Sequence, residues 1–302
     1  MKQAIKGLVL GLTASLCLLL SAARVSADIS LANNFGIQIE QFTTSDGETI
    51  YESLDGLAID GSGNLYVAVP SLADAHLGTI VKFDTNGSNF VFASGLTDPG
   101  GLAFDKSGNL YVTESDISDP DIMKVDLDGN VSVFAPTQSG GDYGIAVDSN
   151  GNVYVASFYH RRIYKYDQNG NASLFALFGS VQLLSGLAID QSGNIYAASN
   201  SGTIGKFDSS GNETNFAVGL FGNPSGLAFD AQGNLYAADF GSPIEEFSPT
   251  GSESLFSNLG FSYGPQFIAI QVPEPSAWSL AAIGFLILGV WRFLPAIYGT
   301  MA

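Results

Sequence analysis

From residue 56 to residue 270, short apolar runs alternate with polar turn residues at a nearly constant interval. Gly56-Leu57-Ala58-Ile59-Asp60 recurs in closely similar form at 101–105, 144–148, 186–190 and 226–230, so the spacings are 45, 43, 42 and 40 residues. Three further apolar runs follow in each interval, as at 65–68, 80–83 and 90–93 in the first. The pattern predicts four short strands per repeat.

Polar turn residues separate these runs in a fixed register. Asp-x-x-Gly-Asn follows the first run of each unit at 60–64, 105–109, 148–152, 190–194 and 230–234. A second Asp-x-x-Gly set stands between the third and fourth runs, at 84–87, 126–129, 167–170 and 208–211. Asp favours the start of a type I turn, and Gly accepts the left-handed conformation that follows. Four strands in 40 to 45 residues predict an all-β fold, a β-propeller.

Partial repeats at both ends predict a sixth blade. Residues 267–270 match the first strand of a unit, and residues 29–32, 39–42 and 49–51 match its second, third and fourth strands. Joining the two ends closes the ring and removes free sheet edges. We therefore expect a six-bladed β-propeller of four-stranded blades over residues 28–271, closed by N- and C-terminal strands that share the sixth blade.

The motif Gly-[Leu/Ile]-Ala-[Ile/Val/Phe]-Asp-x-x-Gly-Asn-[Leu/Val/Ile]-Tyr resembles NHL-repeat propellers. The resemblance covers nearly the whole of residues 28–271. Arg162-Ile163-Tyr164-Lys165-Tyr166-Asp167 also resembles the third strand of that family, although the other units lack the arginine.

The two ends of the chain resemble targeting segments. Residues 1–27 have a basic start, an apolar stretch and the small-residue sequence Val25-Ser26-Ala27, which predicts a secretory signal peptide cleaved after Ala27. Cys17 lies in that stretch, so the cleaved protein would contain neither a disulfide nor a thiol nucleophile.

Residues 272–302 resemble the PEP-CTERM sorting signal of Gram-negative bacteria. Pro273, Glu274 and Pro275 form the motif, 277–291 a short transmembrane helix, and Arg292 the basic end. The resemblance implies processing by an exosortase, transient inner-membrane anchoring, and a place in the cell envelope or outside the cell. A plain C-terminal membrane anchor is the alternative.

The net negative charge of the chain argues against one class of partner, nucleic acids. The chain carries 29 acidic and 11 basic residues, a net charge of −18, and residues 28–271 keep 28 and 7 of these, a net charge of −21. Nucleic-acid binding through phosphate neutralisation requires clustered basic charge, so we expect no nucleic-acid partner.

Candidate chemistry lies on the face opposite the regular turns, because variable loops on a rigid scaffold commonly carry function. Asp55 precedes the first repeat glycine and Tyr143 precedes the third. Phe158, Tyr159, His160 and Arg161 form an aromatic and basic run on an acidic protein, a combination that suits sugar or protein contacts. We name these six residues as the candidate ligand face.

Two metal hypotheses remain open. Gluconolactonase-type propellers hold a divalent ion over the axis, but here Asp55 is the single carboxylate at the corresponding positions before the repeat glycines. Asp116, Asp119 and Asp121 form a weak candidate for structural Ca²⁺, without the spacing of a dedicated calcium loop.

The sequence thus predicts a secreted, exosortase-sorted propeller that acts as a non-catalytic binding module of the cell envelope or extracellular polysaccharide matrix. An exopolysaccharide or an envelope protein would be its partner, and no cofactor is required. One alternative is a metal-dependent lactonase, hydrolase or lyase of the gluconolactonase-like type, and another is a structural matrix protein.

Overall fold

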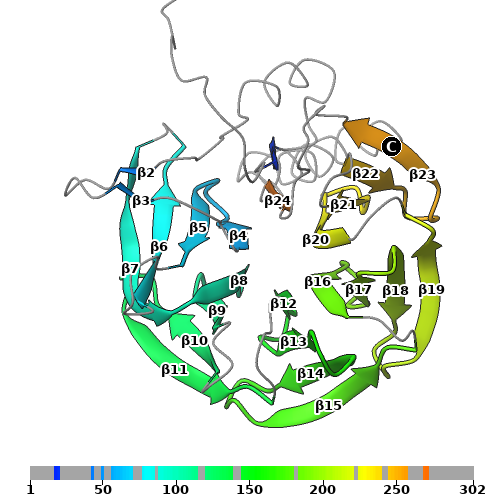
Figure 1. Ribbon diagram of the computed structural model, residues 1–302, viewed down its shortest axis with the longest axis horizontal. Helices are drawn as coiled ribbons and strands as arrows, with labels where there is room; N and C mark the ends of the chain where they lie inside the picture. The colour runs from blue at the N-terminus through cyan, green and yellow to red at the C-terminus, as the bar shows by residue number, and fades with distance from the viewer. Residues whose placement is uncertain are drawn as a thin grey trace, which may run out of the picture.

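The computed structural model describes residues 17–20, 42–43, 49–50, 56–70, 77–85, 88–114, 120–138, 144–179, 183–220, 224–239, 244–257 and 268–271. Five four-stranded antiparallel sheets account for most of these residues, and each is one repeat of the sequence. The all-β propeller prediction is confirmed, and Figure 1 shows the sheets arranged as blades around a common axis.

Each blade runs from the axis outward in chain order. The first blade consists of β4 (Gly56–Ile59), β5 (Leu65–Val69), β6 (Leu77–Phe83) and β7 (Asn89–Thr97). The second consists of β8 (Pro99–Phe104), β9 (Leu110–Glu114), β10 (Asp121–Val125) and β11 (Val131–Pro136). The third consists of β12 (Gly144–Val147), β13 (Val153–Ser157), β14 (Arg162–Tyr166) and β15 (Ala172–Leu177).

The fourth blade consists of β16 (Leu184–Ile189), β17 (Ile195–Ser199), β18 (Thr203–Phe207) and β19 (Glu213–Val218). The fifth consists of β20 (Pro224–Phe229), β21 (Leu235–Asp239), β22 (Ile244–Phe247) and β23 (Glu253–Ser257). The remaining strands are β1 (Cys17–Leu20), β2 (Phe42–Thr43), β3 (Thr49–Ile50) and β24 (Ile268–Gln271).

Tight turns occupy one face of the ring, here called the turn face, because they connect the first to the second strand and the third to the fourth. In each of the five first turns the glycine N–H donates to the aspartate carbonyl, as Gly151 N does to Asp148 O at 3.0 Å. In the fifth blade, Ser248 takes the place of aspartate between β22 and β23, and its hydroxyl accepts a hydrogen bond from Ser252 N. The opposite face, here called the loop face, carries the other connections.

The core lies between neighbouring blades. A tyrosine near the start of each second strand packs edge-on against phenylalanines, as Tyr196 does against Phe216 and Phe229 at ring-centroid distances of 5.0 and 4.9 Å. In the first four blades a third-strand lysine lies over this tyrosine ring, as Lys206 does at 5.1 Å from the ring centroid. Burial raises the pKa of Tyr196, which stays a neutral hydrogen-bond donor to Asp190.

Close backbone contact explains the repeat glycine in three blades, at Gly56, Gly144 and Gly186. A Cβ atom at Gly144 would overlap the carbonyl oxygen of Ser185, and one at Gly56 would overlap that of Gly100. Each of these oxygens belongs to the inner strand of the next blade. The inner strands therefore approach one another more closely than a side chain at this position permits.

The sixth blade is the point at which the prediction was wrong. Five four-stranded blades are present in the described part of the chain, and of the sixth only the predicted first strand, β24, stands in the ring. It contacts β20 on one side and β4 on the other, so six inner strands surround the axis. β2 and β3 form a separate two-stranded sheet.

β24 has a partner that the sequence analysis did not predict. It pairs in parallel with β1, whereas residues 29–32, which we expected to form the second strand of this blade, lie outside the described residues. In the five blades, a short turn links the first strand to the second and sets their register. No such turn exists here, because the two strands come from opposite ends of the chain, so local sequence could not fix this pairing.

The targeting segments are largely outside the described ranges. The structure does not describe the predicted cleavage site or the sorting motif, which comprise Ala27, Pro273, Glu274, Pro275 and Arg292. Signal cleavage and sorting therefore stay predictions. β1 lies within the predicted signal peptide. Where the structure is described, no helix is long and apolar enough to cross a membrane.

Candidate ligand face

The predicted ligand-face residues are only partly described. Asp55 and Tyr143 lie outside the described ranges, as do Asp116 and Asp119 of the calcium hypothesis. Asp121 opens β10, opposite Pro136 of β11. The structure brings the other four candidates, Phe158 to Arg161, together in the loop between β13 and β14 on the loop face.

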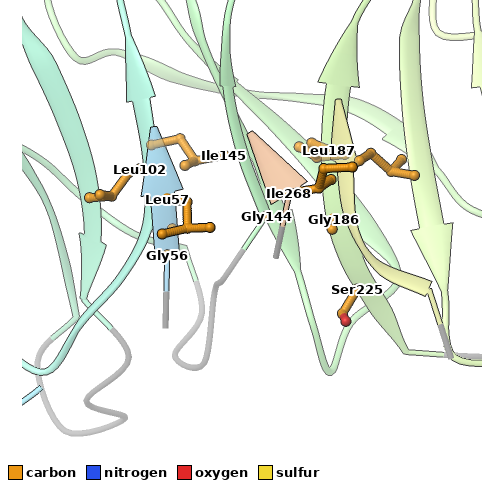
Figure 2. A pocket seen from close by; sticks show the side chains of 12 residues that line it. Gly56, Leu57, Leu102, Gly144, Ile145, Gly186, Leu187, Ser225 and Ile268 are labelled. Carbon is orange, nitrogen blue, oxygen red and sulfur yellow. The ribbon is translucent and has the colours of Figure 1, made fainter. Parts of the chain in front are cut away.

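At the centre of the loop face, a small cavity of about 70 Å³ opens at the ends of the inner strands. Its lining consists of repeat glycines, the aliphatic residues that follow them and one serine: Gly56, Leu57, Gly101, Leu102, Gly144, Ile145, Gly186, Leu187, Ser225, Gly226, Leu227 and Ile268. Figure 2 shows aliphatic side chains of this lining and the hydroxyl of Ser225. Typical small-molecule sites have volumes of roughly 300 Å³ or more, so this cavity alone does not accommodate a sugar-sized ligand.

The described residues around the axis do not fit the divalent ion that a gluconolactonase-type resemblance implies. Such an ion requires about six oxygen ligands, several of them charged. Ser225 is the only polar side chain in the cavity lining. Within the described ranges, no group of three or more His, Cys, Asp or Glu side chains could hold a metal.

A second group of polar residues on this face escaped the sequence analysis. The last residue of the second strand is polar in four of the five blades, at Glu114, Ser157, Ser199 and Asp239. Glu114 is buried and accepts a hydrogen bond from Thr97 N at 2.6 Å, and Ser199 shares one with Ser201 at 2.8 Å. These two side chains bond to nearby connections, so they help to hold the loops. In the sequence, these residues could have been recognised as polar residues that end an otherwise apolar run.

The loop between β13 and β14 concentrates exposed aromatic and basic chemistry. We call residues 158–162 the aromatic–arginine tip. Tyr159 is 61% exposed, the most exposed aromatic residue in the described part of the chain. The half-buried ring of Phe158 meets it edge-on at a centroid distance of 5.0 Å. The tip therefore presents a flat ring to solvent with a fixed neighbour behind it.

Two hydrogen bonds restrain polar side chains of the tip. The hydroxyl of Ser157, which is fully buried, lies 3.1 Å from His160 Nδ1. Arg162 Nη1 donates to the hydroxyl of Tyr164 at 3.1 Å. His160, Arg161 and Arg162 are all exposed. Restrained, exposed donors of this kind can bind an acceptor with a smaller loss of side-chain entropy.

Arg161 adopts a backbone conformation that normally belongs to glycine. Its φ is +54°, and Asp98 is the other non-glycine residue with positive φ in the described ranges. Gly202 takes the corresponding place in the fourth blade, with φ of +69°. Both carbonyls accept a hydrogen bond from the chain just beyond the fourth strand, from Phe178 N at 2.9 Å and Leu220 N at 3.1 Å. A non-glycine residue in this region costs about 1–3 kcal/mol.

Sequence comparison relates part of the chain to a known family. The SMP-30/gluconolactonase/LRE-like region matches residues 70–176, about a third of the chain. No curated protein matches the sequence.

Solved structures resemble most of the chain at low identity. A chain from a nidogen–laminin complex is 20% identical with a TM-score of 0.63, over 73% of this chain and 86% of that one. Catalytically inactive virginiamycin B lyase from Staphylococcus aureus with quinupristin is 17% identical with a TM-score of 0.60, over 76% and 77%. A gluconolactonase from Xanthomonas campestris is 17% identical with a TM-score of 0.54, over 74% and 76%.

These identities establish the propeller fold and no activity. The partial match to the SMP-30/gluconolactonase/LRE-like family favours the enzymatic alternative over the non-catalytic interpretation. The described lining of the axial cavity contains no acidic or histidine side chain.

Proposed function

We propose that this protein is a secreted binding module that holds a ligand of the cell envelope or extracellular polysaccharide matrix on its loop face. One observation carries the proposal. The exposed ring of Tyr159 and the exposed residues Arg161 and Arg162 lie together at the aromatic–arginine tip, whereas the axial cavity is small and is lined by glycines, aliphatic side chains and one serine. Aromatic rings beside arginine are common in surfaces that bind partners.

Retention on polysaccharide extracted from the producing cell tests this proposal. We expect the full-length protein to be retained, and a Tyr159→Ala, Arg161→Ala double variant to elute early. A matched control is Asn200→Ala, Ser201→Ala in the β17–β18 loop of the fourth blade, which should be retained like the wild type. Unchanged retention of the Tyr159, Arg161 variant would remove the proposal.

A metal-dependent lactonase or lyase is the second candidate, and the family match favours it. If a divalent ion binds the folded state, stability rises by about 2.7 kcal/mol at a hundred times the dissociation constant. A melting curve of the full-length chain, chelated and then titrated with Ca²⁺, Mn²⁺ or Zn²⁺, separates the candidates. We expect a flat response. A saturable increase at micromolar metal, lost in Asp55→Ala and accompanied by lactone hydrolysis, would replace the binding proposal with the enzymatic one.

The proposal includes export and sorting by the two terminal segments. Cleavage after Ala27 would give a released protein that begins at Asp28. Exosortase processing would remove the segment that follows the Pro273-Glu274-Pro275 motif. The mass of the released protein tests both steps, and a full-length mass would contradict them.

A further inference from the structure

We infer that the aromatic–arginine tip recognises a carboxylated sugar unit, a hexuronate at or near the end of a short oligosaccharide. The inference rests on the proposed binding function and adds the chemical class of its ligand. It is argued from the ring of Tyr159, the backbone of Arg161 and the charge of the surrounding protein.

Tyr159 supplies a stacking surface. Its ring is well exposed, yet the edge-on contact with Phe158, with the ring planes 90° apart, restrains it. A tyrosine ring offers a flat apolar face with few side-chain torsions to immobilise. The C–H face of a pyranose ring is also flat and apolar. Stacking of the two leaves the polar substituents of the sugar at its rim, where the neighbouring residues of the tip lie.

Arg161 supplies the charge that distinguishes an acidic sugar from a neutral one. Arg161 is an exposed residue and follows Tyr159 by two positions. A planar guanidinium matches a carboxylate with two parallel hydrogen bonds. The fourth blade forms the corresponding turn with Gly202, so the fold itself requires no arginine here. A residue retained in a strained conformation in place of glycine points to a role for its side chain.

The neighbours of Arg161 complete a cationic spot. Arg161 and Arg162 are consecutive and exposed, and residues 28–271 contain only seven basic side chains. The Ser157–His160 hydrogen bond engages Nδ1 of the imidazole. The ring's other nitrogen, Nε2, is left as a further polar group at the sugar rim.

Overall charge limits the size of the ligand. Residues 28–271 carry a net charge of −21, which repels long polyanions. Salt screens this repulsion beyond about 8 Å at physiological ionic strength, so a short acidic ligand at the tip interacts mainly with the local arginines. A protein partner is less well matched, because a stable protein interface takes about 20–30 residues a side and the tip has five.

Calorimetric titration of the full-length protein tests the inference with two matched probes. One probe is a tetrasaccharide that ends in glucuronate, and the other is its methyl ester, which has the same ring and no charge. We expect the wild type to bind the acid about tenfold more tightly than the ester, since hydrogen bonds between charged groups are the stronger ones. Arg161→Gly should weaken binding of the acid about tenfold and leave binding of the ester unchanged. Tyr159→Ala should weaken both.

A folding readout separates loss of the site from loss of the fold. Arg161→Gly relieves the backbone strain, so its melting temperature should equal or exceed that of the wild type while binding falls. Gly202→Ala in the fourth blade is the control, and it should melt earlier but bind the acid normally. A destabilised Arg161→Gly that loses binding of both probes would contradict the inference.

Other outcomes separate this inference from the proposed function. Equal affinity for acid and ester, or wild-type affinity in Arg161→Gly, would overturn the carboxylate assignment. Failure to bind either probe, with retention on the cell's own polysaccharide, would overturn it and leave the binding function in place. Failure in both assays would overturn both proposals.

Discussion

The aromatic–arginine tip and the β17–β18 loop of the fourth blade are built on the same backbone frame. Each follows a buried serine, Ser157 or Ser199, at the end of the second strand. Each includes a left-handed residue whose carbonyl is held from beyond the fourth strand. After the serine, and up to and including the left-handed residue, the third blade has four residues, Phe158-Tyr159-His160-Arg161, and the fourth has three, Asn200-Ser201-Gly202.

The difference shows which part of the tip the fold requires. In the fourth blade, small polar side chains satisfy one another, as in the Ser199–Ser201 hydrogen bond. In the third blade, an exposed ring and a strained arginine replace them. The frame belongs to the repeat, so the side chains of the tip are the part available for function.

A substitution at the contact between the inner strands of these two blades should have the largest effect on stability. Gly144 opens the third blade, and a Cβ there would overlap the carbonyl oxygen of Ser185 in the fourth. Gly144→Ala should cost about 3 kcal/mol, because the neighbouring inner strands must move apart. Thermal unfolding should shift down by roughly 6–12 °C for a domain of this size. Gly193→Ala, whose Cβ would meet nothing within 4 Å, should cost less, because only the strain of its positive φ of +83° remains. Equal melting of Gly144→Ala and the wild type would refute the glycine argument.

Substitution of arginine for Gly202 in the fourth blade should have the next largest effect on stability. Gly202→Arg recreates the strain of Arg161, and its Cβ would also lie 2.6 Å from the carbonyl oxygen of Leu220. We expect a loss of about 2 kcal/mol in unfolding free energy, measured by denaturant titration. It should not create a second ligand site, because the fourth blade has no exposed ring beside it. A stabilised variant would show that positive φ carries no penalty in this frame.

The turn face of the third blade should contribute a smaller, pH-dependent effect. Partial burial raises the pKa of Asp148, but hydrogen bonds from the side chain and N–H of Asn152 and from Asn150 N outweigh it and hold the pKa below its usual range. This carboxylate therefore stabilises the fold above about pH 4, and its contribution is lost as pH falls through the lowered pKa.

Asp148→Asn tests that contribution. The variant should melt a few degrees below the wild type at pH 7, and the gap should narrow below about pH 4. Ligand binding should be unchanged, because the turn lies on the opposite face from the tip. A gap that widens in acid would reverse the assigned direction of the pKa shift.

Regular sequence predicted the regular part of the fold. The Asp-x-x-Gly-Asn turns are local, so five repeats led directly to five blades. Ser248 shows the limit of that reasoning, since a serine does the work of aspartate and leaves no motif. The prediction of a sixth four-stranded blade was wrong for a related reason. Without a turn between its first two strands, nothing local sets their pairing.

The candidate site was predictable in composition and not in conformation. Phe158 to Arg161 were identifiable as an aromatic and basic run in an acidic chain. The equivalence of Arg161 to Gly202 was not, because the two loops differ by one residue and only the matching carbonyl hydrogen bonds align them. Ser157 was missed because a serine that ends an apolar strand gives no sign of the histidine three residues later.

The position of β24 implies an order in which the blades form and the ring closes. Residues 268–271 are among the last of the chain to be synthesised, yet they stand between β20 and the much earlier β4. The five blades can form one after another as the chain is synthesised, whereas the ring can be completed only when its final strand is available. Until then, the facing edges of the first and fifth blades would lack this strand and would be open to a chaperone or to another unfinished copy.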